Sequence, residues 1–364
     1  MVPLWLIWLA LIPVSTAFFV PRSRCVMALR ATSEEILDKP KWAGSNDLLS
    51  TAVNALINFK PLFGVMKIAA RNTLIDTAEK NGIPWRERAR DLIGKQNLLE
   101  RNLEDLVDRS IVYPSYYVQE FHAYDEGNLN WQAAVECESA TLSMALRVWP
   151  KDSLTSTEAQ DRLRSSFLSS VCSFIKERAK IATDPERILD VGASVGISTF
   201  YLARAFPQAK QILGLDLSPH FLAVAHQRQK SEAEVQRLWS SDKLERITWK
   251  HANMEQSGLR DNDFDLTCSS FMFHELPQKE SADIIREMYR VTKFGGVVAI
   301  TDNNPKSPII QNLPPVLFTL MKSTEPHSDE YYTFDLEQAI EQAGFKYVTT
   351  LASDPRHRTI LAVK

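Results

Sequence analysis

The segment RILDVGASVGISTFYLARAFP, residues 187–207, holds residue types that can bind a ligand through the backbone. A short apolar strand that contains Asp190 leads into a turn with Gly192 and Gly196, and a helical pattern follows. Glycine lets the backbone approach a ligand closely, and the start of a helix offers free N–H groups. The next apolar run, ILGLD, ends in Asp216. Because a carboxylate at the tip of the second strand accepts hydrogen bonds from a ribose diol, the pattern predicts an adenosine-type ligand.

The turn itself distinguishes between adenosine cofactors. The dinucleotide fingerprint G-x-G-x-x-G requires a middle glycine, which the segment GASVG, residues 192–196, lacks. Asp190 directly precedes this turn, where its carboxylate would repel a pyrophosphate but would suit the amino acid end of S-adenosylmethionine (SAM). The segment DVGASVG resembles motif I of class I SAM-dependent methyltransferases, D-x-G-x-x-x-G.

Four later segments extend this resemblance over residues 187–364. The acid Asp216 resembles the ribose-binding acid of the family, and HANME resembles the third-strand segment that flanks adenine, with Asn253 where Asp is commoner. DNDFDLTCSSFMFHELP and MYRVTKFGGVVAITD resemble the fourth-strand and fifth-strand motifs. The resemblance implies SAM as cofactor, with contacts from Asp190, Gly192, Ala193, Gly196, Asp216, Leu217, Asn253, Met254, Ser269 and Ser270.

The elements around these motifs fall into two regions. Residues 45–180 carry apolar side chains at three- and four-residue spacing, which predicts a helical N-terminal region. In residues 181–364 short apolar runs alternate with helical stretches, which predicts β-α-β units and a parallel sheet. GFKYVTTLASD and HRTILAVK indicate a closing antiparallel pair. The predicted fold is therefore α/β: as the resemblance implies, a Rossmann-like, seven-stranded class I methyltransferase sheet, mostly parallel, with the last strand antiparallel and a helical N-terminal region.

Methyl transfer from a sulfonium is an in-line displacement, in which the enzyme mainly aligns the reactants. A general base is needed only where the acceptor must lose a proton. We predict His274, just after the fourth strand, as this base and Glu275 as the second choice. The alternative for His274 is a helix cap or a hydrogen bond to a backbone carbonyl. The predicted acceptor-side residues are His122, Tyr124, Asp125, Glu126, His327 and Tyr331. The stretch YDEG, residues 124–127, could instead form a turn between helices with Gly127 as its left-handed residue.

The N-terminal leader has the features of a targeting sequence. Residues 4–20 form an uncharged apolar run that is interrupted by Pro13 and is short for a helix that spans a membrane. The run contains the small-x-small pattern Ser15-Thr16-Ala17. The acid-free, Arg-bearing stretch FFVPRSRCVMALRATS follows, so residues 1–32 resemble the two-part presequences of algae with complex plastids. The segment 114–139 resembles one ahead of the methyltransferase domain in plant and cyanobacterial plastid-type proteins. We predict plastid import; a secretory signal and a membrane anchor are the alternatives.

Composition excludes several other classes of protein. The chain has 364 residues, 45% hydrophobic and 24% charged, with a net charge of −3 that becomes −6 without the three arginines of the leader. An acidic body without clustered basic residues disfavours nucleic-acid binding. Four cysteines without C-x-x-C spacing and scattered histidines predict neither a disulfide framework nor a metal site. The expected partner is a small, apolar acceptor such as a quinone or a pigment precursor. After removal of the leader, we expect the protein itself to have no stable membrane anchor.

Two other functions compete with methyl transfer. Residues 192–196 also satisfy G-x-S-x-G, the nucleophile elbow of α/β-hydrolases, with Ser194 as nucleophile and with Asp302 and His327 or His357 in the required chain order. However, a helical half precedes the elbow, and Asp216 would have no role. The second alternative keeps the fold without catalysis, as a plastid assembly factor.

Overall fold

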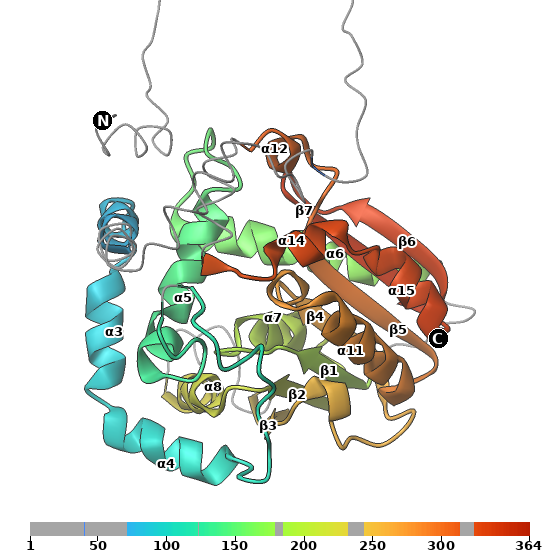
Figure 1. The fold of residues 1–364 in the computed structure, drawn as a ribbon, viewed down its shortest axis with the longest axis horizontal. Helices are drawn as coiled ribbons and strands as arrows, with labels where there is room; N and C mark the ends of the chain where they lie inside the picture. The colour runs from blue at the N-terminus through green and yellow to red at the C-terminus, as the bar shows by residue number, and fades with distance from the viewer. Residues whose placement is uncertain (1–39, 41–70, 123, 179–184, 232–243, 314–323) are drawn as a thin grey trace, which may run out of the picture. The chain divides into compact units, whose positions relative to one another are not determined.

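The computed structural model describes residue 40 and residues 71–122, 124–178, 185–231, 244–313 and 324–364. In this part of the chain one seven-stranded sheet has the order β3-β2-β1-β4-β5-β7-β6 (Figure 1). Its strands are β1 (Arg187–Val191), β2 (Gln211–Asp216), β3 (Ile247–His251), β4 (Phe264–Ser270), β5 (Thr292–Asn303), β6 (Lys346–Ala352) and β7 (His357–Val363). Strands β1 to β5 are parallel, whereas β7 is antiparallel to β5 and to β6. The predicted fold class is therefore confirmed, including its antiparallel closing pair.

Helices cover both faces of the sheet, because the central strands alternate apolar side chains between two cores. Ile188 belongs to the core under α6 (Ser156–Glu177) and α7 (Ile197–Ala205). Leu189 belongs to the opposite core under α11 (Gln278–Val291), α14 (Ser328–Thr333) and α15 (Leu336–Ala343). The remaining elements of this half are α8 (Pro219–Ser231), α12 (Pro308–Gln311) and the 3-10 turns η3 (Met254–Gln256) and η4 (Phe273–Glu275).

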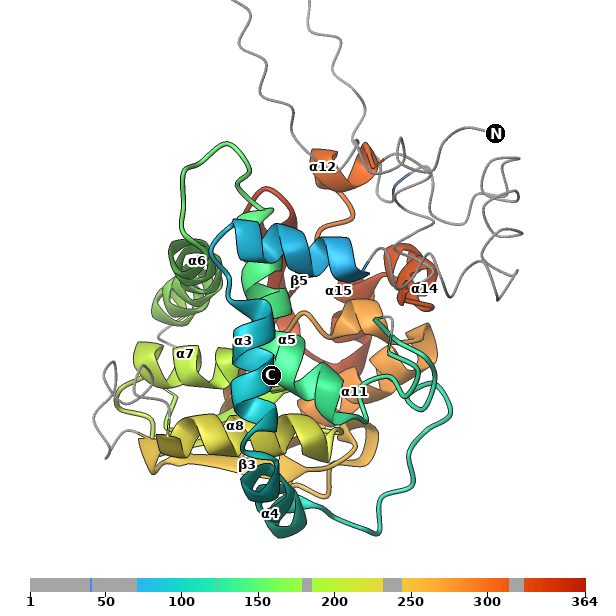
Figure 2. The same ribbon diagram turned by 90° about the vertical axis from the view of Figure 1, so that its left-hand side faces the viewer.

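The described part of the N-terminal region consists of helices joined by turns and by one long non-helical segment. Besides α6 it contains α3 (Trp85–Ile93), α4 (Gln96–Leu106) and α5 (Trp131–Leu146), and the long non-helical segment lies between α4 and α5. Figure 2 shows α3 and α5 side by side, and α4 packs on α8. These helices and the sheet belong to one compact unit. The leader, residues 1–32, and the predicted helical residues 45–70 lie outside the described residues.

Two local signals explain where the long helices begin. The Asn130 side chain accepts a hydrogen bond from the Ala133 N–H at the start of α5. Thr155 and Glu158 form a capping box at the start of α6, which satisfies backbone groups that the first turn leaves unpaired. None of the helices in the described ranges is both long enough and apolar enough to cross a bilayer.

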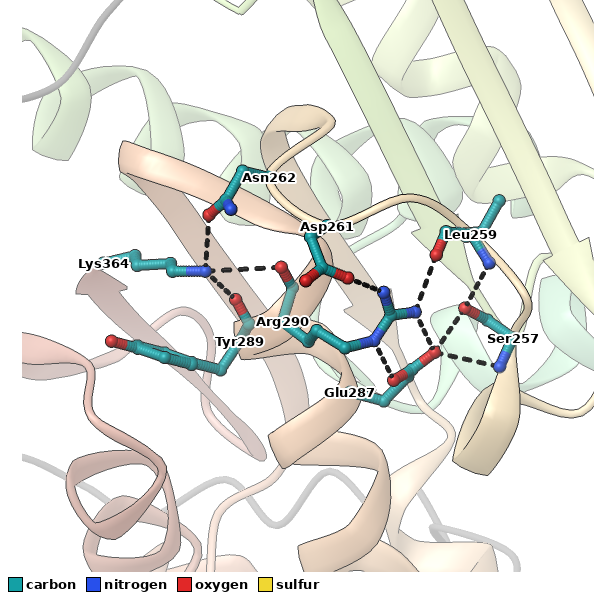
Figure 3. Close-up of polar contacts among 8 residues, drawn as sticks. All are labelled: Ser257, Leu259, Asp261, Asn262, Glu287, Tyr289, Arg290 and Lys364. Carbon is teal, nitrogen blue, oxygen red and sulfur yellow. Dashed lines mark hydrogen bonds and ion pairs between the residues drawn. The ribbon is translucent and has the colours of Figure 1, made fainter.

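Charged side chains fasten the sheet at the edge where the parallel strands begin (Figure 3). Arg290, in the last turn of α11, donates to Glu287 at 2.7 Å and also pairs with Asp261 in the loop before β4. Glu287 in turn accepts from the backbone N–H of Ser257 at 2.9 Å. The terminal Lys364 reaches the Tyr289 carbonyl at 2.6 Å. This network, which we call the lower network, connects α11 to the preceding loop and to the end of β7.

Candidate active site

The turn between β1 and α7 is built so tightly that side chains would not fit at its two glycines. Gly192 and Gly196 have φ angles of 72° and 83°, in the left-handed region that glycine tolerates. A Cβ atom on Gly192 would lie 2.7 Å from Met272 Sδ, and one on Gly196 would lie 2.6 Å from the Trp249 ring. The predicted Gly turn therefore brings bare backbone to the carboxyl end of β1, the position at which open α/β sheets bind ligands.

Asp190 is fully buried beside this turn, and half of its carboxylate is unused. One oxygen, Oδ2, accepts hydrogen bonds from Ser198 Oγ at 2.7 Å and from Thr199 Oγ1 at 2.6 Å. The other, Oδ1, accepts no hydrogen bond from any residue that the structure describes, and the same holds for the buried hydroxyls of Ser269 and Ser270 at the end of β4. Burial raises the pKa of Asp190 to about 6. Since native proteins pair nearly all buried polar atoms, these three atoms indicate the place of a polar ligand.

Asp216 joins the Gly turn to the end of β2. Its Oδ2 accepts from the Ser194 N–H at 2.8 Å, and its Oδ1 accepts from the Ser218 N–H at 2.8 Å. Burial raises its pKa to about 6 as well. Each carboxylate oxygen has a second lone pair, so Asp216 can hold these backbone groups and still accept hydrogen bonds from a ribose diol.

The remaining predicted cofactor residues lie at the ends of β2 and β3. The carbonyl of Leu217 is 3.0 Å from His251 Nε2. The Asn253 side chain caps η3 by accepting from the Glu255 N–H at 2.9 Å, so its oxygen is already engaged. Met254 is buried. The donors and acceptors present fit SAM: Asp190 Oδ1 has no hydrogen-bond partner among the described residues and could accept from the ammonium group, and Asp216 could accept from the ribose.

Three tyrosines that the sequence prediction missed come from the segment between α4 and α5, which Figure 1 shows running from α4 past β3. Tyr116 Oη donates to Glu255 at 2.7 Å, and Tyr113 Oη lies 3.3 Å from His251 Nε2. Burial, followed by the charge of Asp216, raises the pKa of Tyr117. This segment therefore lies against the cofactor end of the site. Its P-S-Y-Y sequence was the signal from which its part in the site could have been predicted.

The two predicted catalytic residues have different surroundings. His274 Nδ1 lies 2.8 Å from Asp302 Oδ1, and the His274 backbone N–H donates to Asp302 Oδ2 at 3.2 Å. Burial lowers the pKa of His274, but the charge and the hydrogen bond of Asp302 outweigh it and raise the pKa to about 10. Burial raises the pKa of Glu275, whose carboxyl group makes no side-chain hydrogen bond to the described residues. His274 thus holds a proton at neutral pH, whereas Glu275 can accept one.

Three of the six predicted acceptor residues lie near these groups. His122 Nε2 is 3.6 Å from Glu325, and the His122 N–H donates to the Thr324 carbonyl at 2.9 Å. The ring of Tyr331 has its centroid 6.4 Å from that of His274. His327 contacts Tyr116 edge to face, with centroids also 6.4 Å apart.

The other three predicted acceptor residues lie on the turn before α5. Tyr124 Oη donates to Glu136 in α5 at 2.6 Å, while Asp125 and Glu126 are exposed on the turn. Sequence reasoning missed Glu325, a carboxylate whose pKa is lowered by the His122 hydrogen bond against the effect of burial. Its only sequence signal was its place two residues before His327.

The described residues do not form the catalytic triad that the hydrolase alternative requires. Ser194 Oγ lies 3.2 Å from Cys137 Sγ. The rings of His327 and His357 pair with acids near them in sequence, and Asp302 pairs with His274 instead. No cluster of three or more metal-ligating side chains occurs in the described ranges.

Residues 189–300 match the family described as "Methyltransferase domain". The chain carries a SAM-dependent methyltransferase domain. It is 26% identical over 169 residues to a demethylmenaquinone methyltransferase of Lactiplantibacillus plantarum, a match that covers 45% of this chain and 67% of that protein. An uncharacterized methyltransferase of Synechocystis is 28% identical, with 45% and 68% covered. An arsenite methyltransferase of Aquipseudomonas alcaligenes is 29% identical over 32% of each chain.

Solved methyltransferase structures resemble the methyltransferase domain at lower identity. The Synechocystis magnesium protoporphyrin IX methyltransferase with bound S-adenosylhomocysteine (SAH) is 15% identical, with a TM-score of 0.39 over 60% of this chain and 91% of that one. The Haemonchus contortus phosphoethanolamine N-methyltransferase 2 is 19% identical, with a TM-score of 0.38. That match spans 54% of this chain and 52% of the other, about half of each.

Proposed function

We propose that this protein transfers the methyl group of SAM to a small, largely apolar plastid metabolite that gives up a proton to Glu275. The observation that carries the cofactor half of the proposal is the fully buried Asp190, whose Oδ1 has no hydrogen-bond partner among the described residues. A buried carboxylate is costly unless it is paired. The charge of Arg164 compensates part of this cost, and the ammonium group of SAM would bind Oδ1 directly.

Within the methyltransferase domain each residue then has one task. Asp190 binds the ammonium group and Asp216 the ribose, while the Gly turn lets the cofactor approach the backbone. SAM supplies the methyl group on a positively charged sulfur, and the protein aligns it with the acceptor. Glu275 takes the acceptor proton because its carboxyl is unpaired and has a raised pKa. The Asp302–His274 pair positions the turn that carries Glu275, since Asp302 binds both the ring and the backbone of His274.

Aromatic rings lie near Glu275 among the titratable side chains of His122, His274, Glu325 and Asp302, and these rings support an aromatic acceptor. The rings of Tyr331 and His274 meet edge to face, and Tyr116 lies against His327 at the same side. Several relatives are demethylmenaquinone methyltransferases by name, which supports a quinone-like molecule. The plastid location rests on the resemblance of the leader to two-part plastid presequences.

Calorimetric titration of SAM, and then of SAH, into residues 33–364 tests the cofactor half. We expect micromolar binding that Asp216→Ala abolishes, because the variant loses both the ribose acceptor and the anchor of the Ser194 N–H. Asp152→Asn, on an exposed acid that pairs with Arg162, is the control and should bind like the wild type. A folded wild type that binds neither compound contradicts methyl transfer and favours the assembly-factor alternative.

A further inference from the structure

One buried histidine fastens the segment between α4 and α5 to the sheet. His251 is the last residue of β3 and is 3% exposed. Its Nδ1 accepts from the Asp108 backbone N–H at 2.9 Å, and its Nε2 lies 3.0 Å from the Leu217 carbonyl and 3.3 Å from Tyr113 Oη. Asp108 and Tyr113 belong to residues 108–117, which we call the tyrosine strap, whereas Leu217 directly follows β2. One imidazole ring therefore joins the strap to the loop after β2.

The partners of His251 define which of its nitrogens carries a proton. A backbone N–H can only donate, so Nδ1 presents its lone pair to Asp108. A carbonyl can only accept, so Nε2 carries the hydrogen that faces Leu217. The neutral ring satisfies both partners. A second proton, on Nδ1, would point at the Asp108 N–H and break that hydrogen bond.

The surroundings of His251 favour the neutral ring. Burial lowers its pKa from the usual 6.5, although the Leu217 carbonyl and the charge of Asp108 act in the opposite direction. The Asp108 carboxylate is already engaged, because its Oδ1 accepts from the Ser110 N–H at 2.9 Å and from the Ser110 hydroxyl at 2.6 Å. The titratable groups that interact with the ring or adjoin it are Asp108 and Tyr113 of the strap, Asp216 opposite it on β2, Lys250 before it on β3 and His220 in α8.

The strap extends from this attachment to the cofactor end of the site. The rings of Tyr113 and Tyr117 stack, with planes 9° and centroids 6.3 Å apart. Tyr116 meets Tyr117 edge to face, and its hydroxyl donates to a carboxylate of η3. Burial and the charges of Asp216 and Glu275 raise the pKa of Tyr117, as expected of a ring between the ribose acid and the turn after β4. A displacement of Tyr113 therefore changes the position of Tyr117 at the site.

We propose that His251 is a positioning residue: its neutral ring holds the tyrosine strap against bound SAM, and a second proton releases the strap. This inference rests on the proposed function for the identity of the ligand, whereas the attachment at His251 does not depend on it. A ligand that contacts the attached strap shifts the equilibrium towards it. Since the released ring is exposed to water and binds a proton more readily, acid favours release and should weaken cofactor binding.

Hydrogen exchange of the full, ligand-free chain, measured by mass spectrometry from pH 5 to pH 8, reports the attachment without any ligand. We expect peptides from the strap to be protected at pH 8. After correction for the intrinsic effect of pH on exchange, they should lose protection below about pH 6.5, the ordinary pKa of histidine. Peptides from β2 should stay protected throughout and serve as the internal reference.

Two substitutions each preserve one contact of His251. His251→Asn places an acceptor near the position of Nδ1 and binds no proton, so the strap should stay protected down to pH 5. His251→Gln places an amide near the position of Nε2 but offers no acceptor to the Asp108 N–H, so protection of the strap should be low at every pH. His226→Asn changes a histidine of α8 whose pKa burial also lowers. It is the matched control and should keep the pH dependence of the wild type.

Calorimetric titration of SAH connects the strap to the cofactor. At pH 7, His251→Gln should bind SAH about tenfold more weakly than the wild type, the contribution of roughly one hydrogen bond, whereas His251→Asn should bind it nearly as tightly. From pH 7 to pH 5 the affinity of the wild type should fall more steeply than that of His251→Asn. The difference between these two proteins reports His251, because Asp190 and Asp216, with pKa values of about 6, titrate in the same range in both.

The outcomes that overturn the proposal differ from failure of the proposed function. Strap protection that is equal at pH 5 and pH 8 in the wild type, or equally pH-dependent in His251→Asn, overturns it. Normal SAH affinity in His251→Gln with an unprotected strap also overturns it, because the strap then does not position the cofactor. A wild type whose strap responds to pH but which binds no SAH contradicts the proposed function instead. A variant that also loses protection in β2 is misfolded, and the pH response of the wild type then decides.

Discussion

The edge of the sheet where the parallel strands begin and the edge where they end differ in how their charged groups are paired. Where the strands begin, the lower network pairs Arg290 with Glu287 and Asp261 (Figure 3). Nearby, Lys293 pairs with Asp265 at 2.7 Å. Where the strands end, Asp190 Oδ1 is buried without a hydrogen-bond partner among the described residues. The first edge is complete as folded, whereas the second is complete only with ligands. Substitutions at the two edges should therefore change different measured quantities.

Glu275→Gln should give the largest effect, on catalysis alone. The amide keeps the shape of the side chain but accepts no proton, so we expect kcat to fall by about 10²–10⁴-fold, the usual contribution of a general base. The Kd for SAM and the Tm should stay near those of the wild type.

The pH dependence gives an independent check of Glu275. Burial raises its pKa, so wild-type activity should rise with pH through that raised value and then level off. The variant should lack this limb of the profile. An unchanged kcat, or an unchanged acid limb, would remove Glu275 from the mechanism and return His274 to consideration.

Arg290→Gln should give the converse result in the lower network. The change leaves Glu287, whose side chain is 10% exposed, without its cation, and it also releases Asp261 and the Leu259 carbonyl. We expect the free energy of unfolding to fall by roughly 1–3 kcal/mol, because Arg290 is only partly buried but its loss removes two hydrogen bonds from the nearly buried Glu287 carboxylate. Urea denaturation measures this change, and calorimetry should show an unchanged Kd for SAM. A large loss of SAM affinity at normal stability would contradict the separation of the two edges.

Sequence alone could predict the fold and the cofactor half of the site because their signals are local. Asp190, Gly192 and Gly196 lie within seven residues, and the apolar runs that form the strands are continuous. The seven strands and the antiparallel direction of the last one followed from the resemblance to the methyltransferases, whereas the strand order comes from the structure. The relative placement of the predicted cofactor residues then follows from the sheet, because it brings the ends of β1, β2 and β4 together.

The acceptor half could not be predicted in the same way, because segments distant in sequence form it. His122 meets Glu325 across about two hundred residues, and Arg164 meets Phe271 across about a hundred. Tyr124 was predicted to line the acceptor site, but its hydroxyl donates to Glu136 in α5, only twelve residues away. The polar motif around Tyr124 therefore showed which polar side chains are present, but not which partner each of them contacts.

Asp190→Asn should give the smallest effect, and its sign depends on pH. The pKa of Asp190 is raised from 3.8 to about 6 in the folded protein, so between these values the native state binds more protons than the unfolded state. Stability from this group is therefore present below about pH 4 and is lost as the pH rises to about 6. The neutral amide does not ionise, so the variant should be more stable than the wild type at pH 7 by about 1–2 kcal/mol and should show a flatter profile from pH 4 to 6. Unfolding of the ligand-free protein across that range measures the difference, and Asp263→Asn at the opposite edge should not flatten the profile.

With SAM bound at pH 7, the wild type should be more stable than Asp190→Asn. The ammonium group of SAM offsets the cost of ionising Asp190, and only the wild type has this carboxylate. A variant that binds SAM as tightly as the wild type, or that keeps the wild-type pH profile, would show that Asp190 is a structural acid like those of the lower network.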